Sequence, residues 1–467
     1  MKIARKKSYS GVFRDGGAGP NAKKRFRLRR QKLMKQENKL MVLTGVPYGP
    51  GAETLWTYAH CPTYQEPTIM HLTGVNQAKV LLLLDPGAKG ADEILFVEKK
   101  NPKMEFWDGL RFGVGDPKSL AEVKKVTGFR EVRDIAEFDL VFKERLSKQK
   151  KKEVGTFWLE GGAGKNKKKV TTDHNWAFKK RIDKLVRNAW GKGFPVSNIM
   201  KSHFDLRLPL DKYDVSNTLK AQKITGLAFR ETLKEFRKFK NECQIQGHLE
   251  GRMLFRSAFG LSFPSIIASG PNATVLHYMK NDDDFTPDEM VLMDFGVRWM
   301  TMHADISRTV PASGKFNPMQ KLLYEIVLGA QIAVQKKARA GVTIEELNTV
   351  CWETLNRELD EQFHARGGES NLEYKSRPHG VSHLIGEQEH DGDPFRDYTK
   401  QPMKTGWMIS NEPGLYGKFR IKIGRKTYKE QLGIRLEDNL LITDKGCRNL
   451  SVSVPKQVSE IEALMRG

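Results

Sequence analysis

The stretch "MDFGVRWMTMHADISRTV", which runs from Met293 to Val310, places Asp294 and Asp305 eleven positions apart among apolar residues. The apolar residues at both ends indicate two buried strands joined by a turn, so both carboxylates are expected to lie out of water. A buried ionised carboxylate is unfavourable unless a cation or hydrogen-bond donors compensate its charge. For either aspartate alone, Arg308 or backbone N–H groups would be sufficient compensation.

The composition bounds the class of protein. The 467 residues are 39% hydrophobic and 9% aromatic, which is enough for two or three domains with hydrophobic cores. The chain has no run of roughly eighteen apolar residues, so we expect no membrane span. Cys61, Cys243, Cys351 and Cys447 lie far apart, which argues against a disulfide framework or a structural zinc site. Such cysteine usage is typical of a reducing compartment, and we expect the cytoplasm.

The chain is strongly basic, with a formal net charge of +23. A field of this sign would attract anions such as nucleic acid or acidic membrane surfaces. Much of the excess is local: residues 1–30 hold a single acid, Asp15, and lysine blocks follow at Lys148–Lys152 and Lys165–Lys169. Because no nucleic-acid-binding signature accompanies the charge, we interpret residues 1–30 as a disordered arm and the blocks as solvated loops. Nucleic-acid binding is the alternative.

The basic start also bears on targeting. No apolar segment follows it, so a secretory signal is not expected. A transit peptide is a second interpretation, because the segment is rich in arginine and poor in acids.

Residues 31–204 are predicted to form an N-terminal domain of mixed α/β type. Buried strands are expected over residues 39–46, 78–85 and 93–99. The lysine-rich, glycine-containing residues 147–170 are predicted to be a surface insertion.

Residues 205–467 show a different pattern, in which pairs of helices alternate with strands. Asn317 with Pro318 predicts the start of one helix, and Thr343 with Glu346 has the spacing of a capping box at the start of another. The expected helices cover residues 215–239, 242–260, 316–341 and 343–363. The expected strands cover residues 263–270, 274–278, 406–414 and 433–443, besides the pair that contains Asp294. This order predicts an α+β domain with helices on one side of an antiparallel sheet.

The pattern repeats loosely. Two helices precede strands that carry Asp294 and Asp305, and two further helices precede strands that carry Glu412 and Glu437. Two similar halves that face each other would bring four carboxylates together, which a bound pair of cations satisfies more directly than salt bridges do.

A histidine cluster completes this set. His379, His383 and His390 fall within "RPHGVSHLIGEQEHDGDP", although the whole chain has only eleven histidines. Carboxylates with one imidazole suit hard divalent ions, manganese in particular, and two such ions can turn water into a nucleophile near neutral pH.

Several stretches resemble the pita-bread metallopeptidases, and specifically the aminopeptidase P family (Xaa-Pro aminopeptidases). They are "NATVLHY", "MDFGVRWMTMHADISRTVPASGKF", "HGVSHLIG", "NEPGLY" and "GIRLEDN", with a weaker match in "IMHLTGV" and "EFWDGLRFG". The resemblance implies a C-terminal pita-bread domain over residues 205–467, with pseudo-twofold halves, after the N-terminal domain. It also implies two divalent metal ions, of which Asp294 would bind one. Asp305 and Glu437 would bridge both, and His383 and Glu412 would complete the second.

The resemblance assigns further roles. Glu412 would also pass a proton from the attacking water to the leaving nitrogen. His277 and His390 would hold the scissile carbonyl, and His379 and Arg435 would recognise proline and orient the site.

The implied activity is removal of an N-terminal residue that precedes proline in a peptide, by a homo-oligomer, either a dimer or a tetramer. Trp107 resembles an aromatic wall near the site of the family. Two stretches depart from the family pattern and leave the substrate open: "RWMTMHA" has no Tyr-Gly pair, and "EQEHDGD" is more acidic. Two alternatives remain, a prolidase that cleaves Xaa-Pro dipeptides and a non-catalytic pita-bread binding protein.

Overall fold

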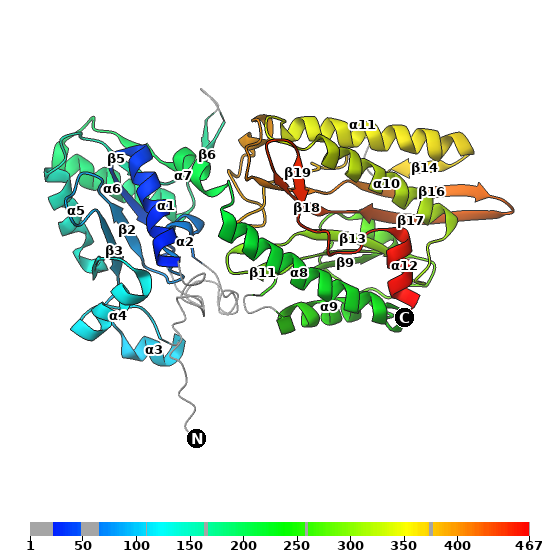
Figure 1. Cartoon of the computed structure of the whole chain (residues 1–467), viewed down its shortest axis with the longest axis horizontal. Helices are drawn as coiled ribbons and strands as arrows, with labels where there is room; N and C mark the ends of the chain where they lie inside the picture. Colours follow the sequence, from blue (N-terminus) through cyan, green and yellow to red (C-terminus); the bar gives the residue numbers. More distant parts are fainter. Residues whose placement is uncertain are drawn as a thin grey trace, which may run out of the picture. The chain divides into compact units, whose positions relative to one another are not determined.

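The computed structural model describes residues 22–47, 65–108, 110–162, 167–256, 260–372 and 377–466, without the side chains at positions 107 and 108. The chain forms two compact units, of which the first ends at Arg207 and includes Asp393–Arg396, and the second begins at Leu208 (Figure 1). Among the helices in these ranges, none combines the length and the apolar character that crossing a bilayer requires.

The first unit is built on a six-stranded sheet with the order β4-β3-β2-β1-β5-β8. The strands β1, β2 and β3 pair antiparallel, whereas β4, β5 and β8 join their neighbours in parallel. The mixed α/β N-terminal domain expected from the sequence is therefore confirmed. The strands are β1 (Leu40–Thr44), β2 (Leu81–Leu84), β3 (Glu93–Val97), β4 (Glu131–Asp134), β5 (Val154–Thr156) and β8 (Val196–Asn198). The helices are α1 (Ala22–Glu37), α2 (Pro67–Thr73), α3 (Pro102–Asp108), α4 (Pro117–Thr127), α5 (Phe138–Ser147), α6 (His174–Trp190) and α7 (Met200–Arg207).

The prediction of a surface insertion over residues 147–170 is wrong in its middle. Strand β5 lies inside the sheet between β1 and β8, and Val154 is fully buried in the core. The lysines on either side masked this three-residue strand, because strand periodicity is not recognisable over so short a length. The lysines Lys148 and Lys150–Lys152 are exposed, as expected.

The prediction of disorder over residues 1–30 is wrong for residues 22–30, which belong to helix α1; residues 1–21 lie outside the described ranges. Phe26 and Leu33 of α1 are buried, and the Arg30 side chain is fully buried as well. The Arg30 guanidinium donates to both carboxylate oxygens of Glu93, at 2.6 and 3.0 Å, and to Leu72 O at 2.8 Å. A count of charges cannot reveal this, because the acid that compensates Arg30 lies 63 positions away in the sequence.

In its described residues the second unit contains three three-stranded antiparallel sheets, the two-stranded sheet β11-β12, and two pairs of packed helices. The sheets have the orders β13-β10-β9, β14-β16-β17 and β15-β18-β19. Helix α8 packs against α9, β11 and β12, and α10 packs against α11, β15, β16 and β17. The order helix, helix, strands thus occurs twice, as the sequence indicates.

The element bounds of this unit are as follows. The helices are α8 (Lys212–Glu235), α9 (Glu242–Arg256), α10 (Pro318–Lys337), α11 (Ile344–Gln362) and α12 (Val458–Arg466). The strands are β9 (Ile266–Ser269), β10 (Met290–Phe295), β11 (Arg298–Trp299), β12 (Met302–His303), β13 (Ile306–Pro311), β14 (Glu369–Leu372), β15 (Met408–Asn411), β16 (Gly414–Ile423), β17 (Lys426–Arg435), β18 (Asp438–Ile442) and β19 (Cys447–Asn449).

The first unit contains one further, short pair of strands, β6 (Glu160–Gly161) with β7 (Lys168–Lys169).

Local sequence signals explain the helix starts. Asn317 caps α10 by accepting from Met319 N and Gln320 N, and Thr343 forms a capping box with Glu346 at the start of α11, both as predicted. The strand expected over residues 274–278 is wrong: Thr274 ends a 3-10 helix that begins at Gly270, and residues 275–277 form a bend and a turn. A run of two or three β-branched residues is too weak a signal to identify a strand.

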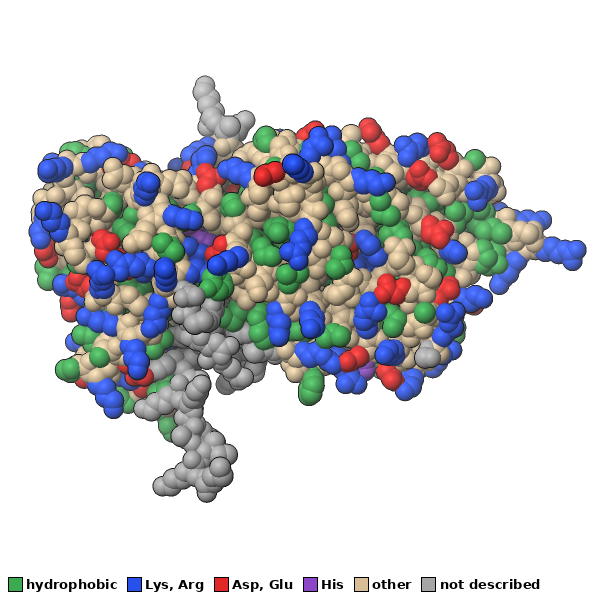
Figure 2. Space-filling model, in the orientation of Figure 1, with side chains coloured by type: hydrophobic (Ala, Val, Ile, Leu, Met, Phe, Trp, Pro, Cys, Tyr) green, Lys and Arg blue, Asp and Glu red, His purple; other side chains and the backbone are tan. Residues whose placement is uncertain are grey.

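The positive charge is dispersed on the surface. Figure 2 shows Lys and Arg side chains over much of the visible face of both units, mixed with Asp and Glu. That face therefore does not present a single basic stripe of the kind that tracks a nucleic-acid backbone.

Arg30→Ala should lower the free energy of unfolding by about 3–5 kcal/mol, because it leaves the Glu93 carboxylate buried without its cation. Urea unfolding followed by circular dichroism measures the change. Lys32→Ala on the exposed side of the same helix is the control and should change it by less than about 0.5 kcal/mol. If both variants lower the free energy of unfolding equally, the ion pair of Arg30 with Glu93 is not important for stability.

Glu66 predicts a pH dependence of stability. This buried carboxylate caps α2 through Ile69 N at 3.0 Å, and burial raises its pKa to about 7 although the cap bond acts in the opposite direction. Between pH 4.5 and 7 the folded state therefore binds the proton more tightly than the unfolded state does, so stability falls as the pH rises through this window. Between pH 5 and pH 8, the free energy of unfolding of Glu66→Gln should rise by about 2 kcal/mol relative to that of the parent chain. Glu137→Gln, at an exposed position, should show the same pH dependence as the parent. A difference between Glu66→Gln and the parent that stays constant with pH would refute the raised pKa of Glu66.

Candidate metal centre

Two carboxylates of the site come from the antiparallel strands β10 and β13. Asp294 lies in β10 directly opposite Ser307 of β13, and Asp305 immediately precedes β13. Ladder pairing of these strands places both side chains at one end of the sheet. The other half of the unit supplies two more acids in the same manner: Glu412 follows β15, and Glu437 precedes β18, with which β15 pairs.

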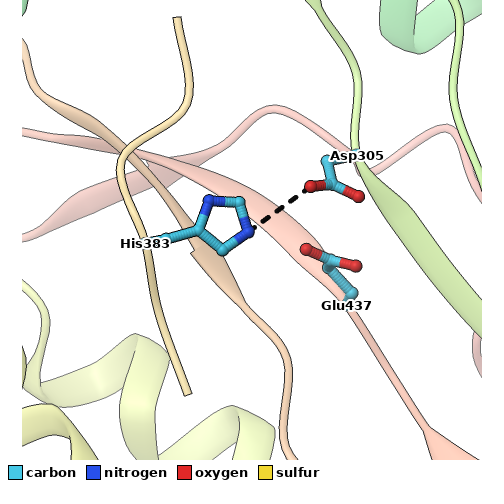
Figure 3. Close-up of side chains that lie close together, drawn as sticks. All are labelled: Asp305, His383 and Glu437. Atoms are coloured by element: carbon cyan, nitrogen blue, oxygen red, sulfur yellow. Dashed lines mark ion pairs between the residues drawn. The ribbon is translucent and has the colours of Figure 1, made fainter. Parts of the chain in front are cut away.

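The structure brings acids from both halves together with one histidine. Ligand atoms of Asp305, His383 and Glu437, all three residues buried, lie within 4.8 Å of one another (Figure 3). The Nε2 atom of His383 is 3.5 Å from Asp305 Oδ2 and 3.4 Å from Glu412 Oε1. The four side chains therefore surround a space of the size that a divalent ion would fill.

The main chain and the ring of His383 are both held in place. His383 N donates to Ser410 Oγ at 2.9 Å, and Ser410 N donates to His383 O at 3.0 Å, which ties this segment to β15. On the ring, Nδ1 is 3.1 Å from Leu384 O. A proton on Nδ1 would bond that carbonyl and leave Nε2 as a lone pair that faces the carboxylates, the usual arrangement of a metal-binding histidine.

Two carboxylate oxygens at this place are buried without a hydrogen-bond partner, Asp294 Oδ1 and Glu437 Oε1. The other oxygen of each is satisfied: Asp294 Oδ2 accepts from Arg435 Nη2 at 2.7 Å, and Glu437 Oε2 accepts from Ser307 Oγ at 3.0 Å. Leaving a buried carboxylate oxygen unpaired is costly, and a coordinated cation removes that cost. The donor set of carboxylates with one imidazole fits a hard divalent ion.

The electrostatics of the cluster agree with an excess of negative charge. Burial raises the pKa of Asp294 to about 6 even though Arg435 opposes the shift, and burial with the neighbouring acids raises the pKa of Glu437 well above its usual range. Burial would lower the pKa of His383, yet Asp305 and Glu412 raise it to about 9. The groups thus favour states that reduce the negative charge, which is what a bound cation would also achieve.

Arg308 does not compensate either aspartate of the opening stretch. It forms an ion pair with Asp438 at 2.7 Å, whereas Arg435 pairs with Asp294. The suggestion that Arg308 satisfies one of these acids is therefore wrong, because the Arg308 side chain, from within β13, pairs with Asp438 instead.

Of the other predicted residues, His379 and Arg435 converge on one group that the sequence reasoning missed, the hydroxyl of Tyr416. His379 Nε2 is 3.0 Å from Tyr416 Oη, and Arg435 Nη1 donates to the same oxygen at 3.4 Å. Burial raises the pKa of Tyr416 to about 12, so this hydroxyl stays protonated. Tyr416 is the last residue of the stretch "NEPGLY", which was the available signal.

His390 and His277 are more exposed. The ring of His390 packs edge-on against His383, with 4.1 Å between centroids. His277 lies in an exposed loop and is close enough to His379 to lower the pKa of that histidine, although burial is the larger cause. The Trp107 side chain lies outside the described part of the chain.

The structure adds three polar groups that the sequence reasoning did not single out. Ser307 joins Glu437 to Arg435, because its hydroxyl donates to the first and accepts from Arg435 Nε at 2.8 Å. Ser410 Oγ donates to Glu412 Oε1 at 3.0 Å. Burial and the nearby Asp305 raise the pKa of Glu389 to about 8. Serines give no signal of their own in a sequence without the strand pairing that directs them.

A largely apolar hollow adjoins Tyr416. Its lining residues are Trp352, Leu355, Asn356, Leu372, Pro378, Gly414, Leu415 and Tyr416. The Trp352 ring also packs edge-on against the His379 ring, with 5.4 Å between the ring centroids. The hollow is therefore contiguous with the polar group formed by His379, Tyr416 and Arg435.

Two family models match the chain. The model of metallopeptidase family M24 matches residues 216–444, and the model of the aminopeptidase P N-terminal domain matches residues 26–154. Among curated proteins, the chain is 27% identical over 409 residues to a Xaa-Pro aminopeptidase of Haemophilus influenzae, covering 86% of this chain and 89% of that protein. It is 26% identical over 451 residues to intermediate cleaving peptidase 55 of Schizosaccharomyces pombe, covering 94% and 86%.

A solved structure extends the likeness to the fold. The aminopeptidase PepP of Pseudomonas aeruginosa matches with a TM-score of 0.77 and 24% identity, covering 95% of this chain and 98% of that one. The expected pita-bread fold, preceded by an N-terminal domain, is thereby confirmed.

Asp305→Ala and His383→Ala should each abolish most divalent-metal binding, because each removes a ligand from the centre of the cluster. Elemental analysis of the purified variants after dialysis against manganese is the measurement. His364→Ala, a histidine that bonds Asp360 and Ser370 instead, is the matched control and should retain the metal. Full metal content in Asp305→Ala would show that the centre is placed wrongly.

Proposed function

We propose that this chain, which matches the models of metallopeptidase family M24 and of the aminopeptidase P N-terminal domain, removes the N-terminal residue of peptides whose second residue is proline. The observation that carries the proposal is the buried cluster of Asp305, His383 and Glu437, in which Glu437 Oε1 has no hydrogen-bond partner. The names of the curated relatives, a Xaa-Pro aminopeptidase among them, support the specificity.

We propose that the site holds two divalent ions, with manganese as the resident metal. Asp294 would bind one ion, His383 and Glu412 the other, and Asp305 and Glu437 both. Bound there, the ions supply a nucleophile derived from water and polarise the scissile carbonyl. The carboxylate-rich donor set supports this choice over a soft metal.

Glu412 is placed to move a proton. Its side chain is 17% exposed, more than those of Asp305 and His383, so it lies toward the open side of the cluster. Ser410 Oγ holds Glu412 Oε1, which leaves the other oxygen for a proton taken from water and delivered to the leaving nitrogen. His277 and His390, exposed at the same site, would orient the scissile carbonyl and stabilise the charge that develops on it.

Recognition of proline is proposed at the polar group of His379, Tyr416 and Arg435. The apolar hollow beside Tyr416 has a volume of about 10 Å³, which is room for one water molecule, so the ring itself would lie outside that hollow. Asp294 is the candidate for the free amino terminus on the other side of the scissile bond, and Trp107 for a further aromatic contact.

The prolidase alternative needs a cation for the carboxylate of a terminal proline. Arg435 is buried and already pairs with Asp294 at 2.7 Å, and Arg420 is exposed and pairs with Glu369 at 2.9 Å. These pairings favour an aminopeptidase, because a peptide that continues past proline presents no carboxylate at that place. The binding-protein alternative differs from both in metal content, since a pure binding module has no use for the ions.

Three further points remain proposals. Relatives of this family are often dimers or tetramers, and we propose a homo-oligomer. We propose the cytoplasm as the compartment, supported by the free state of Cys243, Cys351 and Cys447. Nucleic acid is the less favoured partner, because basic and acidic side chains are mixed on the visible surface (Figure 2).

Xaa-Pro-Xaa tripeptides should be cleaved at least about 10-fold faster, in kcat/KM, than the matching Xaa-Pro dipeptides, because a dipeptide buries an uncompensated carboxylate. Peptides with alanine in place of the second proline should be poor substrates. The measurement uses one peptide, its truncated form and its alanine form, with manganese added.

A preference for the dipeptide would assign the chain to the prolidases. If the protein retains no metal after manganese is added and cleaves none of the peptides, the result would favour the non-catalytic binding protein.

A further inference from the structure

The two acids proposed to bridge the ions, Asp305 and Glu437, come from different sheets. Asp305 precedes β13, which pairs with β10, whereas Glu437 precedes β18, which pairs with β15 and β19. Within the described residues, the main chains meet beside these acids through Glu437 N, which donates to Ser307 O at 3.0 Å. No ladder among the described residues joins the two sheets, so side chains must act together with this one main-chain bond to set the separation of the two carboxylates.

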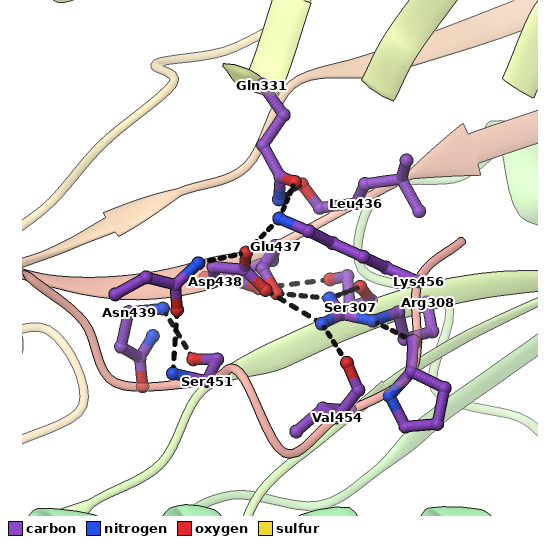
Figure 4. Close-up of polar contacts among 12 residues, drawn as sticks. Ser307, Arg308, Gln331, Leu436, Glu437, Asp438, Asn439, Ser451, Val454 and Lys456 are labelled. Carbon is purple, nitrogen blue, oxygen red and sulfur yellow. Dashed lines mark hydrogen bonds and ion pairs between the residues drawn. The ribbon is translucent and has the colours of Figure 1, made fainter. Parts of the chain in front are cut away.

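Arg308 is the first such side chain and is fully buried (Figure 4). Its Nη1 donates to Ser307 O at 2.9 Å and to Glu437 O. Its Nε donates to Pro455 O at 2.8 Å, and Nη2 donates to Val454 O at 3.1 Å. One guanidinium therefore joins β13, the ligand residue and the C-terminal segment.

Asp438, which follows Glu437 directly, compensates this guanidinium. Its Oδ1 accepts from Arg308 Nη2 at 2.7 Å, and the two side chains are 1% and 0% exposed. Its Oδ2 accepts from Lys456 Nζ and from Asn449 Nδ2, the latter at 2.7 Å. A buried ion pair is weak evidence for stability as such, so its role is better sought in the geometry it fixes.

Asn439, the third residue of this run, holds the other ligand. Its Oδ1 accepts from Asp305 N at 3.1 Å, and its Nδ2 donates to Asp305 O at 2.7 Å. The side-chain amide thus replaces the missing neighbour strand. Asn439 N in turn donates to Ser451 Oγ at 2.8 Å, so the C-terminal segment supports this contact as well.

We propose that Arg308, Asp438, Asn439, Ser451 and Lys456, which we name the C-terminal clamp, are positioning residues that set the affinity for the metal ions. The clamp fixes the main chain of Asp305 on one side and of Glu437 on the other, and it anchors both to the chain's last segment. Ligand atoms must lie within about 0.2 Å of their ideal distances, so loss of this register weakens metal binding before it unfolds the chain. The inference rests on the proposed metal-dependent function.

Two mild substitutions test the clamp. Lys456→Met removes one cation from Asp438 but leaves Arg308 and Asn449, and the Lys456 side chain is already 19% exposed, so the variant should fold. Asn439→Ala removes the amide that brackets Asp305. Lys456→Arg is the conservative variant, which keeps the charge at Asp438.

The control breaks a buried ion pair elsewhere. Arg30 and Glu93 in the first unit are each 1% exposed, so Glu93→Gln tests whether loss of any buried pair lowers metal affinity. Manganese dissociation constants, the absorption spectrum of the cobalt-loaded protein and circular dichroism are measured for all variants well below their melting temperatures.

We expect dissociation constants about 10–100-fold higher for Lys456→Met and Asn439→Ala, a changed cobalt spectrum, and kcat restored by excess manganese. Lys456→Arg should resemble the parent, and Glu93→Gln should lower the melting temperature while the metal affinity stays unchanged. Parent-like affinity and spectrum in both test variants, or an equal loss in Glu93→Gln, would overturn the proposal. A parent that binds manganese but does not cleave proline peptides would instead refute the proposed function and leave the clamp comparison standing.

Discussion

The second unit depends on one electrostatic constraint, the gathering of four acids from two halves of the chain in a place with little access to water. Burial raises the pKa of Asp294 and Glu437, and two of their oxygens find no hydrogen-bond donor. The protein itself supplies Arg435 and His383 as partial compensation. The negative charge that remains uncompensated favours cation binding over a set of salt bridges, in agreement with the match of residues 216–444 to the model of metallopeptidase family M24.

Arg435 connects that constraint to substrate recognition. The same guanidinium pairs with Asp294 and donates to Ser307 Oγ and to the hydroxyl of Tyr416, which lies within hydrogen-bond distance of His379. A change at the proposed proline side of the site would therefore be transmitted through a single buried side chain to Asp294, a proposed metal ligand. A lysine in its place could not make these contacts, because only the planar fork of arginine donates in several fixed directions.

The charge of the chain has a structural meaning that its total conceals. Arg30 and Arg308 are both fully buried, each with its own acid, and neither contributes to a field at the surface. Part of the positive charge of residues 22–30 therefore stabilises the packing of helix α1 within the first unit. Net charge is thus a poor guide to partners where arginines lie inside the fold.

Much of this protein could be predicted from its sequence. Helix starts at Asn317 and Thr343 follow from capping chemistry, which acts over three or four residues, and the acids and His383 were identified from residue types within apolar stretches. Strand β5, helix α1 and the pairing of Arg308 with Asp438 could not be predicted, because each depends on residues more than a hundred positions away or on an acid in another element. Local sequence determines where helices begin and which side chains can bind a cation. Only the tertiary structure decides which charges meet, because that choice is made by strand pairing and burial.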